Sequence, residues 1–157
     1  MRSAQDWIQT LGLQEHPEGG WFKETYRSGL ILPASALPQQ AERHCATVIS
    51  FLLAAPDVSH FHRIAADEHW FFHAGSPLTI HLLENGRHQQ QQLGPDHLQA
   101  WVPADTWFGA TVDQADAYAL VSCVVAPGFD FADFELAKSS DLLALYPEQQ
   151  AIIQRLT

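Results

Sequence analysis

One short stretch in the first half of the chain gathers side chains that could do chemistry: VSHFHRIAADEHWFFHAG, residues 58–75. His60 and His62 are two positions apart, so on a β-strand they face the same side. Glu68, entering from the next strand, would complete a two-histidine, one-carboxylate metal site. Without a metal, His62 could act as a general base that Glu68 orients, with Trp70 in the pocket wall. The residues alone leave both hypotheses open.

A second group of polar residues lies on the strand predicted in WFKETYRS. Strict alternation puts Glu24 and Tyr26 on one face, where Tyr26 is a candidate acid, and Arg27 on the other face. Three of the chain's eight basic residues, Lys23, Arg27 and Arg63, lie in or beside the two suspect strands. Because guanidinium groups bind carboxylates and phosphates well, they suggest an anionic ligand, with surface salt bridges as the alternative.

Two further motifs flank these strands. In HPEGG, the proline and the paired glycines indicate a tight turn, and we interpret Glu18 as structural rather than catalytic. In APGFDFADFELA, aromatic rings surround Asp130, which indicates a rigid flap or a subunit contact, with a ligand-facing aspartate as the alternative.

The elements that must position these residues are mostly β-strands. A short helix is predicted over residues 3–12, a helical tail over 139–157, and an exposed loop, a candidate lid, over 30–44. Between them lie short runs with β-branched or alternating residues and turn signals. These runs are CATVISFLL, SHFHR, EHWFFH, LTIHLLE, HQQQQL, LQAWVP, WFGATV and AYALVSCVVAPGF. The pattern predicts one all-β domain over residues 1–157, a sandwich or jelly roll with terminal helices.

Composition limits the classes of partner. The net charge of −10 repels nucleic acid and anionic lipid. No run of residues has the length and apolarity of a membrane span, and the first residues are too polar for a signal peptide. With only two cysteines, both in apolar runs, we expect buried thiols in a reducing compartment and a cytoplasmic location.

Four motifs, in order, resemble the cupin superfamily: HPEGGWFKETYRS, SHFHRIAADEHWFFHAGSPL, WVPADTWFGA and VAPGFDFADFELA. Within it the chain is similar to the small single-domain family of unknown function numbered cupin family five. The resemblance covers nearly the whole chain. It implies an RmlC-like jelly-roll barrel, a double-stranded β-helix that commonly forms a homodimer, with a pocket inside the barrel. It implies no substrate.

The resemblance also bears on a metal. The first cupin motif asks for His-x-His, a glutamate and a glycine, and His60, His62, Glu68 and Gly75 supply them with one extra residue before the glutamate. The second motif normally adds a histidine where this chain has Phe108. We therefore expect no cofactor, with a divalent metal on His60, His62 and Glu68 as the alternative, in an oxygenase or isomerase.

Sugar-nucleotide epimerases of the related jelly-roll type use a histidine base and a tyrosine acid. The resemblance thus suggests a metal-free, isomerase-like cupin with His62, Tyr26 and Glu68 as catalytic residues. Its small, polar ligand would be anionic or carbohydrate-like, and a non-enzymatic binding protein is the other possibility. The ligand-binding candidates are Glu24, Arg27, Arg63, Trp70 and Phe108.

Overall fold

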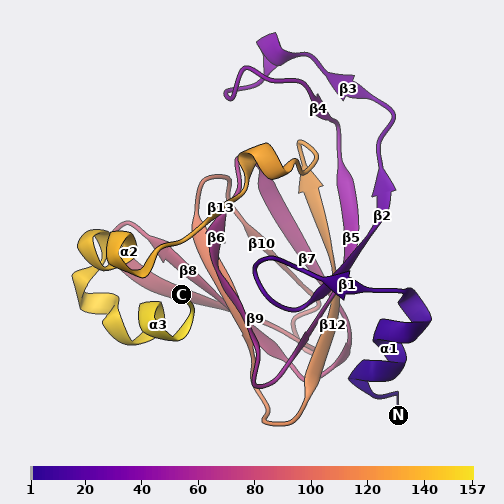
Figure 1. Ribbon diagram of the computed structural model, residues 1–157, viewed down its shortest axis with the longest axis vertical. Helices are drawn as coiled ribbons and strands as arrows, with labels where there is room; N and C mark the ends of the chain where they lie inside the picture. The colour runs from indigo at the N-terminus through magenta and orange to yellow at the C-terminus, as the bar shows by residue number, and fades with distance from the viewer. Residues whose placement is uncertain (1) are drawn as a thin grey trace.

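Two β-sheets facing each other form most of the structure, a computed structural model that describes residues 2–157 (Figure 1). The larger sheet has the order β1-β2-β5-β12-β7-β10, and the smaller has β13-β6-β11-β8-β9. The strands of the larger sheet are, in that order, Gln14–Glu15, Trp21–Arg27, Thr47–Ala54, Tyr118–Ala126, Asp67–Gly75 and Gln99–Val102. Those of the smaller sheet are Glu135–Leu136, Val58–Arg63, Trp107–Val112, Leu78–Glu84 and Arg87–Leu93. The predicted all-β jelly roll is confirmed.

The main core lies between the sheets, because alternate residues of each strand turn inward. Leu78, Ile80 and Leu82 of β8 are buried, and they share one apolar cluster with Trp70 of β7 and Val121 of β12. Burying each such side chain stabilises the fold by about 1.5–3 kcal/mol. The strands that carry the polar residues of interest are therefore held on a closely packed frame.

Short helices cover the outside of the sheets. Helix α1 (Ala4–Leu11) begins at the capping residue Ser3 and packs on the larger sheet. Helices α2 (Ser139–Leu145), η3 (Pro147–Gln149) and α3 (Gln150–Arg155) lie beside the smaller sheet in Figure 1. In residues 2–157 no helix has the length and apolarity to cross a membrane.

The segment predicted as an exposed loop and candidate lid is an arm with its own short hairpin. It contains β3 (Ile31–Leu32), η1 (Ala34–Ala36) and β4 (Arg43–His44), and it extends beyond the sheets at the top of Figure 1. At its base, Arg43 binds Asp133 through two nitrogens, at 2.6 and 2.7 Å. That contact fixes the arm to the segment around η2 (Phe131–Asp133).

A bulge in β2 breaks its alternation. Glu24 is opposite Ile49 of β5, but Tyr26 is opposite the adjacent Val48, so β2 holds one extra residue. After this bulge the two faces of β2 are exchanged. The prediction that Glu24 and Tyr26 share a face is therefore wrong, because Arg27 takes the side expected for Tyr26.

A second bulge lies in β6. His62 is opposite Phe108 of β11, whereas Ser59 is opposite Ala110, so three steps along β6 match two along β11. Ser59 and His62 consequently point to the same side, and His60 does not. The prediction that His60 and His62 share a face is wrong for this physical reason.

Candidate functional site

A cavity of about 310 Å³ lies between the sheets, at the end crossed by residues 128–134, which we call the flap. Strands β2, β5, β7 and β12 form most of its wall, and β6 with the residue after it, the HPEGG turn and the flap complete it. The lining residues are His16, Glu18, Phe22, Glu24, Arg27, Thr47, Ile49, Phe51, His62, Ile64, Glu68, Trp70, Cys123, Val125, Phe129, Asp130 and Phe131. A volume of this size suits a small organic molecule.

A buried ion pair joins His62 to Glu18 at the inner end of the cavity. His62 donates through Nδ1 to the carbonyl oxygen of His60 at 2.8 Å, and its Nε2 lies 2.9 Å from Glu18 Oε2. Burial lowers the pKa of His62, but the charge of Glu18 and its hydrogen bond outweigh burial and raise it. The same contact lowers the pKa of Glu18 against the opposite effect of burial. The contact therefore favours the imidazolium form of His62 and the carboxylate form of Glu18.

The HPEGG turn brings Glu18 to His62. Gly19 has φ +104°, and a Cβ there would overlap the carbonyl oxygen of Val58, so the turn and β6 touch at a position open only to glycine. The backbone N–H and Nδ1 of His60 both donate to the Glu18 carbonyl at 2.7 Å. Ser59 Oγ donates to Glu18 Oε1 at 2.9 Å. The turn is thus fixed to β6 by both main chain and side chain.

His16, from the same turn, is a neutral neighbour of this pair. Its Nδ1 accepts the backbone N–H of Glu18 at 3.2 Å and lies 3.5 Å from Glu18 Oε2. Burial lowers the pKa of His16, and the charge of Glu18 opposes the shift without reversing it. Its ring meets Phe22 edge-on, with centroids 4.5 Å apart. His16 is therefore an uncharged part of the wall.

The pKa of Glu68 on β7 is shifted in the opposite direction from that of Glu18. Burial, followed by the charge of Glu18, raises its pKa to about 7, against the opposing effects of His62, Cys123 and Trp70. Trp70 is two residues along β7, and Cys123 is opposite Trp70 on β12. The indole Nε1 of Trp70 makes no hydrogen bond of good geometry among residues 2–157, although it lies close enough to favour the ionised carboxylate. A carboxyl group that titrates near pH 7 can both give and take a proton.

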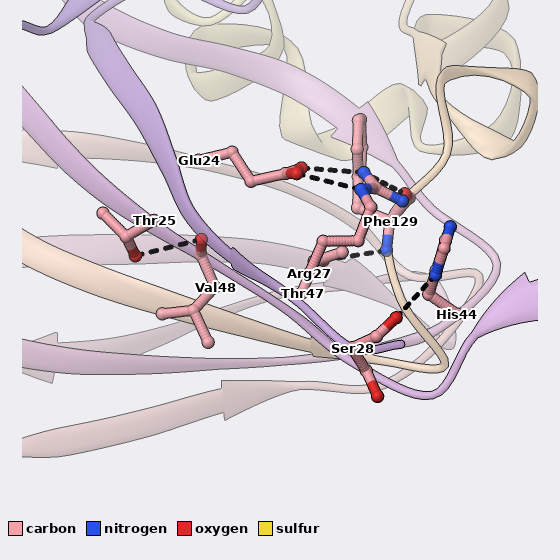
Figure 2. A network of polar contacts seen from close by, with 8 residues as sticks. All are labelled: Glu24, Thr25, Arg27, Ser28, His44, Thr47, Val48 and Phe129. Carbon is pink, nitrogen blue, oxygen red and sulfur yellow. Dashed lines mark hydrogen bonds and ion pairs between the residues drawn. The ribbon is translucent and has the colours of Figure 1, made fainter. Parts of the chain in front are cut away.

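The outer part of the cavity carries a paired arginine (Figure 2). Arg27 donates to Glu24 through Nε at 2.9 Å and Nη2 at 2.7 Å, and Nη2 also donates to the carbonyl oxygen of Phe129 at 3.2 Å. The N–H of Phe129 donates to Thr47 Oγ1 at 2.9 Å. The flap is therefore held against β2 and β5, and it brings Asp130 into the cavity wall, while a ligand contact of Asp130 stays a prediction.

The structure brings together only part of the predicted site. Of the nine candidates, His62, Glu68, Glu24, Arg27 and Trp70 line the cavity. Tyr26 does not, because the β2 bulge turns its side chain outward, where it is 53% exposed. Arg63 binds Glu135 and lies over the ring of Trp107, outside the cavity. Phe108 packs behind His62, with ring centroids 4.2 Å apart, instead of facing a ligand.

The ninth candidate, His60, lies apart from His62 and Glu68, the other two residues of the alternative metal site. It lines another groove, together with residues such as Trp21 and Arg155. Both nitrogens of His62 already contact protein oxygens. Within residues 2–157, no group of three or more histidine, cysteine or acidic side chains is arranged to hold a metal ion. His60, His62 and Glu68 therefore do not fit a metal centre, and the absence of a cofactor stays a prediction.

Sequence reasoning missed the partner of His62. We expected Glu68 to orient this histidine and took Glu18 for a structural residue, but Glu18 makes the ion pair. The signal was present in HPEGG, which puts a histidine and a glutamate two residues apart directly before two glycines. The direction in which these two side chains point depends on how the whole chain folds around the turn. The spacing of the residues in the sequence does not reveal it.

Comparison with known proteins decides the family. The profile described as "Cupin superfamily (DUF985)" matches residues 5–137. The chain belongs to this cupin family. This cupin is 30% identical to an uncharacterised protein of Saccharomyces cerevisiae over 169 residues, covering 90% of this chain and 78% of the yeast protein.

Two solved structures share the whole fold. A protein of Shewanella oneidensis is 41% identical, with a TM-score of 0.90 over 100% of this cupin and 98% of that chain. A hypothetical protein from Leishmania major is 36% identical, with a TM-score of 0.92 over 99% of both chains. The predicted membership of the cupin superfamily is confirmed, and none of these relatives carries a named activity.

Proposed function

We propose that this cupin binds a small, polar, carbohydrate-like molecule in the cavity and catalyses a proton transfer on it without a metal. The observation that carries the proposal is that two buried carboxyl groups in the same cavity have pKa values shifted in opposite directions. Glu18 is ionised and bound to His62, whereas Glu68 titrates near pH 7 with no basic group bound to it among residues 2–157. Such a separation of acidities marks an acid–base site.

Each group has a definite role in this proposal. Ionised Glu68 removes a proton from the carbon next to a carbonyl group, and the electrons of that C–H bond move onto the carbonyl oxygen. The imidazolium of His62 turns its Nε2–H from Glu18 to this oxygen and stabilises the negative charge that develops there. Glu68 then returns the proton to the neighbouring carbon of the enediolate while the hydroxyl proton moves between the two ligand oxygens, so the net reaction is an aldose–ketose isomerisation with no other reactant.

The walls support a ring-shaped, hydroxylated ligand. Aromatic side chains provide flat apolar faces, and Glu24 and Asp130 provide acceptors for hydroxyl groups. Tyr26, suggested by the resemblance to epimerases, has no part in this proposal because it lies outside the cavity. A binding protein without turnover is the second candidate, favoured by the engagement of both His62 nitrogens with protein oxygens.

Deuterium exchange tests the proposal. Protein is incubated with a set of aldoses and ketoses in D₂O, and proton NMR follows exchange at the carbon next to the carbonyl. We expect exchange in at least one sugar. In Glu68→Gln the exchange rate should fall by a factor of about 100 or more, because a general base typically contributes that much to the rate. Glu84→Gln, at the end of β8 and outside the cavity, is the matched control and should exchange like the wild type.

The other outcomes separate the two candidates. Stabilisation by a sugar without exchange, unchanged in Glu68→Gln, would assign the cavity to binding alone. Exchange that survives Glu68→Gln would contradict the role given to Glu68.

A further inference from the structure

The charges of the cavity do not suit an anionic ligand. Its two cations are already neutralised, Arg27 by Glu24 and His62 by Glu18. Two carboxyl groups remain without a bound basic side chain among residues 2–157: Glu68 at the inner end and Asp130 at the flap. Asp130 caps the N–H of Ala132 at 2.8 Å, and its charge also acts on Arg27. The groups left for a ligand to neutralise are therefore acidic.

The basic residues that suggested an anion are engaged elsewhere. Lys23 donates to the carbonyl oxygen of Leu11 at 3.1 Å, outside the cavity. Arg63 binds Glu135 on the surface, and Arg27 donates two hydrogen bonds to Glu24. An anionic ligand would have to break the Arg27–Glu24 pair and would still meet Glu68 and Asp130.

The walls have the character that binds organic cations. Aromatic rings from β2, β5, β7 and the flap surround the space, and the negative face of an aromatic ring attracts a cation. Phe131 is 54% exposed, and its ring centroid lies 4.9 Å from that of Phe129. A net charge of −10 also steers cations toward the protein. The rings in the wall are those of Phe22, Phe51, Trp70, Phe129 and Phe131.

We infer that the ligand is a small organic cation, an amine on a hydroxylated ring, whose ammonium group pairs with Glu68 while its ring lies against the aromatic wall. This inference rests on the binding half of the proposed function and not on turnover. The groups that face Glu68 are Glu18 from the turn, His62 from β6, Trp70 from the same strand β7, and Cys123 from the neighbouring strand β12. Of these, only His62 is cationic, and Glu18 already neutralises it.

Three probes of one shape and different charge test the inference. They are trans-4-aminocyclohexanol, trans-cyclohexane-1,4-diol and trans-4-hydroxycyclohexanecarboxylate, titrated calorimetrically at pH 7.5 and low salt. We expect the amine to bind about tenfold more tightly than the diol, from one ion pair and its aromatic contacts, and the carboxylate to bind most weakly. Amine affinity should also rise from pH 6 to pH 8 as Glu68 ionises, since an alkylamine stays protonated over that range.

Substitutions identify the group responsible. Glu68→Gln should bring the amine and the diol to similar affinity and remove the pH dependence. Glu84→Gln, the matched control on β8, should keep the preference for the amine and its pH dependence. An amine preference that survives Glu68→Gln would overturn the assignment.

The remaining outcomes keep this inference distinct from the proposed function. Equal affinities for the three probes, or tightest binding of the carboxylate, would overturn the inference and leave proton transfer to the exchange experiment. Absence of binding by all three would overturn the inference together with the binding half of the proposed function. An amine preference without any deuterium exchange would support the inference and contradict the proposed turnover.

Discussion

Glu18 and Glu68 face the same cavity, yet their contacts give them opposite acidities. Glu18 receives hydrogen bonds from Ser59 and His62, so its ionised form is stabilised despite burial. Glu68 has burial and the charge of Glu18 against its ionised form. The difference comes from neighbours and not from residue type, because both are glutamates that are 7% exposed.

The raised pKa of Glu68 predicts a particular pH dependence of stability. The folded state keeps a proton on Glu68 up to about pH 7, whereas the unfolded chain releases it near 4.5. The stability from protonated Glu68 is therefore fully present below pH 4.5 and is lost as the pH rises through 7. Between pH 5 and 8 the wild type should lose on the order of 2 kcal/mol of unfolding free energy relative to Glu68→Gln.

Urea denaturation at a series of pH values measures this difference. Glu84→Gln, which removes a carboxylate outside the cavity, should follow the wild type throughout. A constant offset between Glu68→Gln and the wild type from pH 5 to 8 would contradict the raised pKa.

Trp70 should hold the ionised form of Glu68. Its Nε1–H has no well-formed hydrogen bond in residues 2–157, and the nearby carboxyl group of Glu68 is the acceptor it favours. We predict that Trp70→Phe raises the pKa of Glu68 by about one unit, the usual effect of one hydrogen bond to a charged group. Carboxyl ¹³C NMR measures the titration directly. Trp101→Phe, on the exposed face of β10, is the control and should leave the pKa of Glu68 unchanged.

At the level of elements, the turn at residues 16–20 and the two bulges orient the side chains of the site. The β2 bulge sends Arg27 into the cavity, and the β6 bulge lets Ser59 and His62 both reach Glu18. A strand with strict alternation in either place would separate groups that now touch.

Gly19 tests the turn. A side chain at this position would overlap the Val58 carbonyl oxygen, so Gly19→Ala must displace the turn and remove Glu18 from His62. We expect a loss of about 3 kcal/mol or more in unfolding free energy, together with a fall in the pKa of His62 seen by NMR. Gly86→Ala is the matched control, since Gly86 also has positive φ, +76°, but an added Cβ meets nothing within 4 Å. Its cost should be only about 1–2 kcal/mol, and equal losses would contradict the contact with β6.

Much of the fold could be predicted because each strand carries its own pattern. Glu68 and Trp70 were predicted to share a face, and the alternation of β7 does put both on the cavity wall. Tyr26 and His60 were misplaced because a bulge adds one residue without any change in composition that would mark it. The contact of Glu18 with His62 was not predicted because it depends on where a turn meets a strand about forty residues away. Local patterns predict elements, and contacts distant in sequence make the site.

At the level of the whole molecule, we propose a homodimer. Strand β1 covers only Trp21 and Phe22 of β2, so within residues 2–157 no strand pairs with the outer edge of residues 23–27. Beside it Tyr26 and Ile31 are exposed, at 53% and 50%. Antiparallel pairing of two β2 edges about a two-fold axis would cover both the unpaired backbone and these side chains.

Size-exclusion chromatography with light scattering checks the dimer. We expect twice the chain mass of 17.5 kDa at micromolar concentration. The double variant Tyr26→Glu, Ile31→Asp should give the single-chain mass. Leu145→Asp on helix α2, where Leu145 is 64% exposed, is the control and should stay dimeric. A single-chain mass for the wild type would refute the proposal.

The contact between Glu18 and β6 can form only after much of the chain has been synthesised. Glu18 leaves the ribosome early, but the turn that carries it leads into β2, and β2 is held by β5. Strand β5 in turn pairs with β12, which leaves the ribosome long after Glu18. A nascent chain that lacks β12 therefore lacks the partner strand that holds β5, and through β5 and β2 the turn that carries Glu18. The cavity is therefore complete only once β12 has been synthesised and has paired with β5.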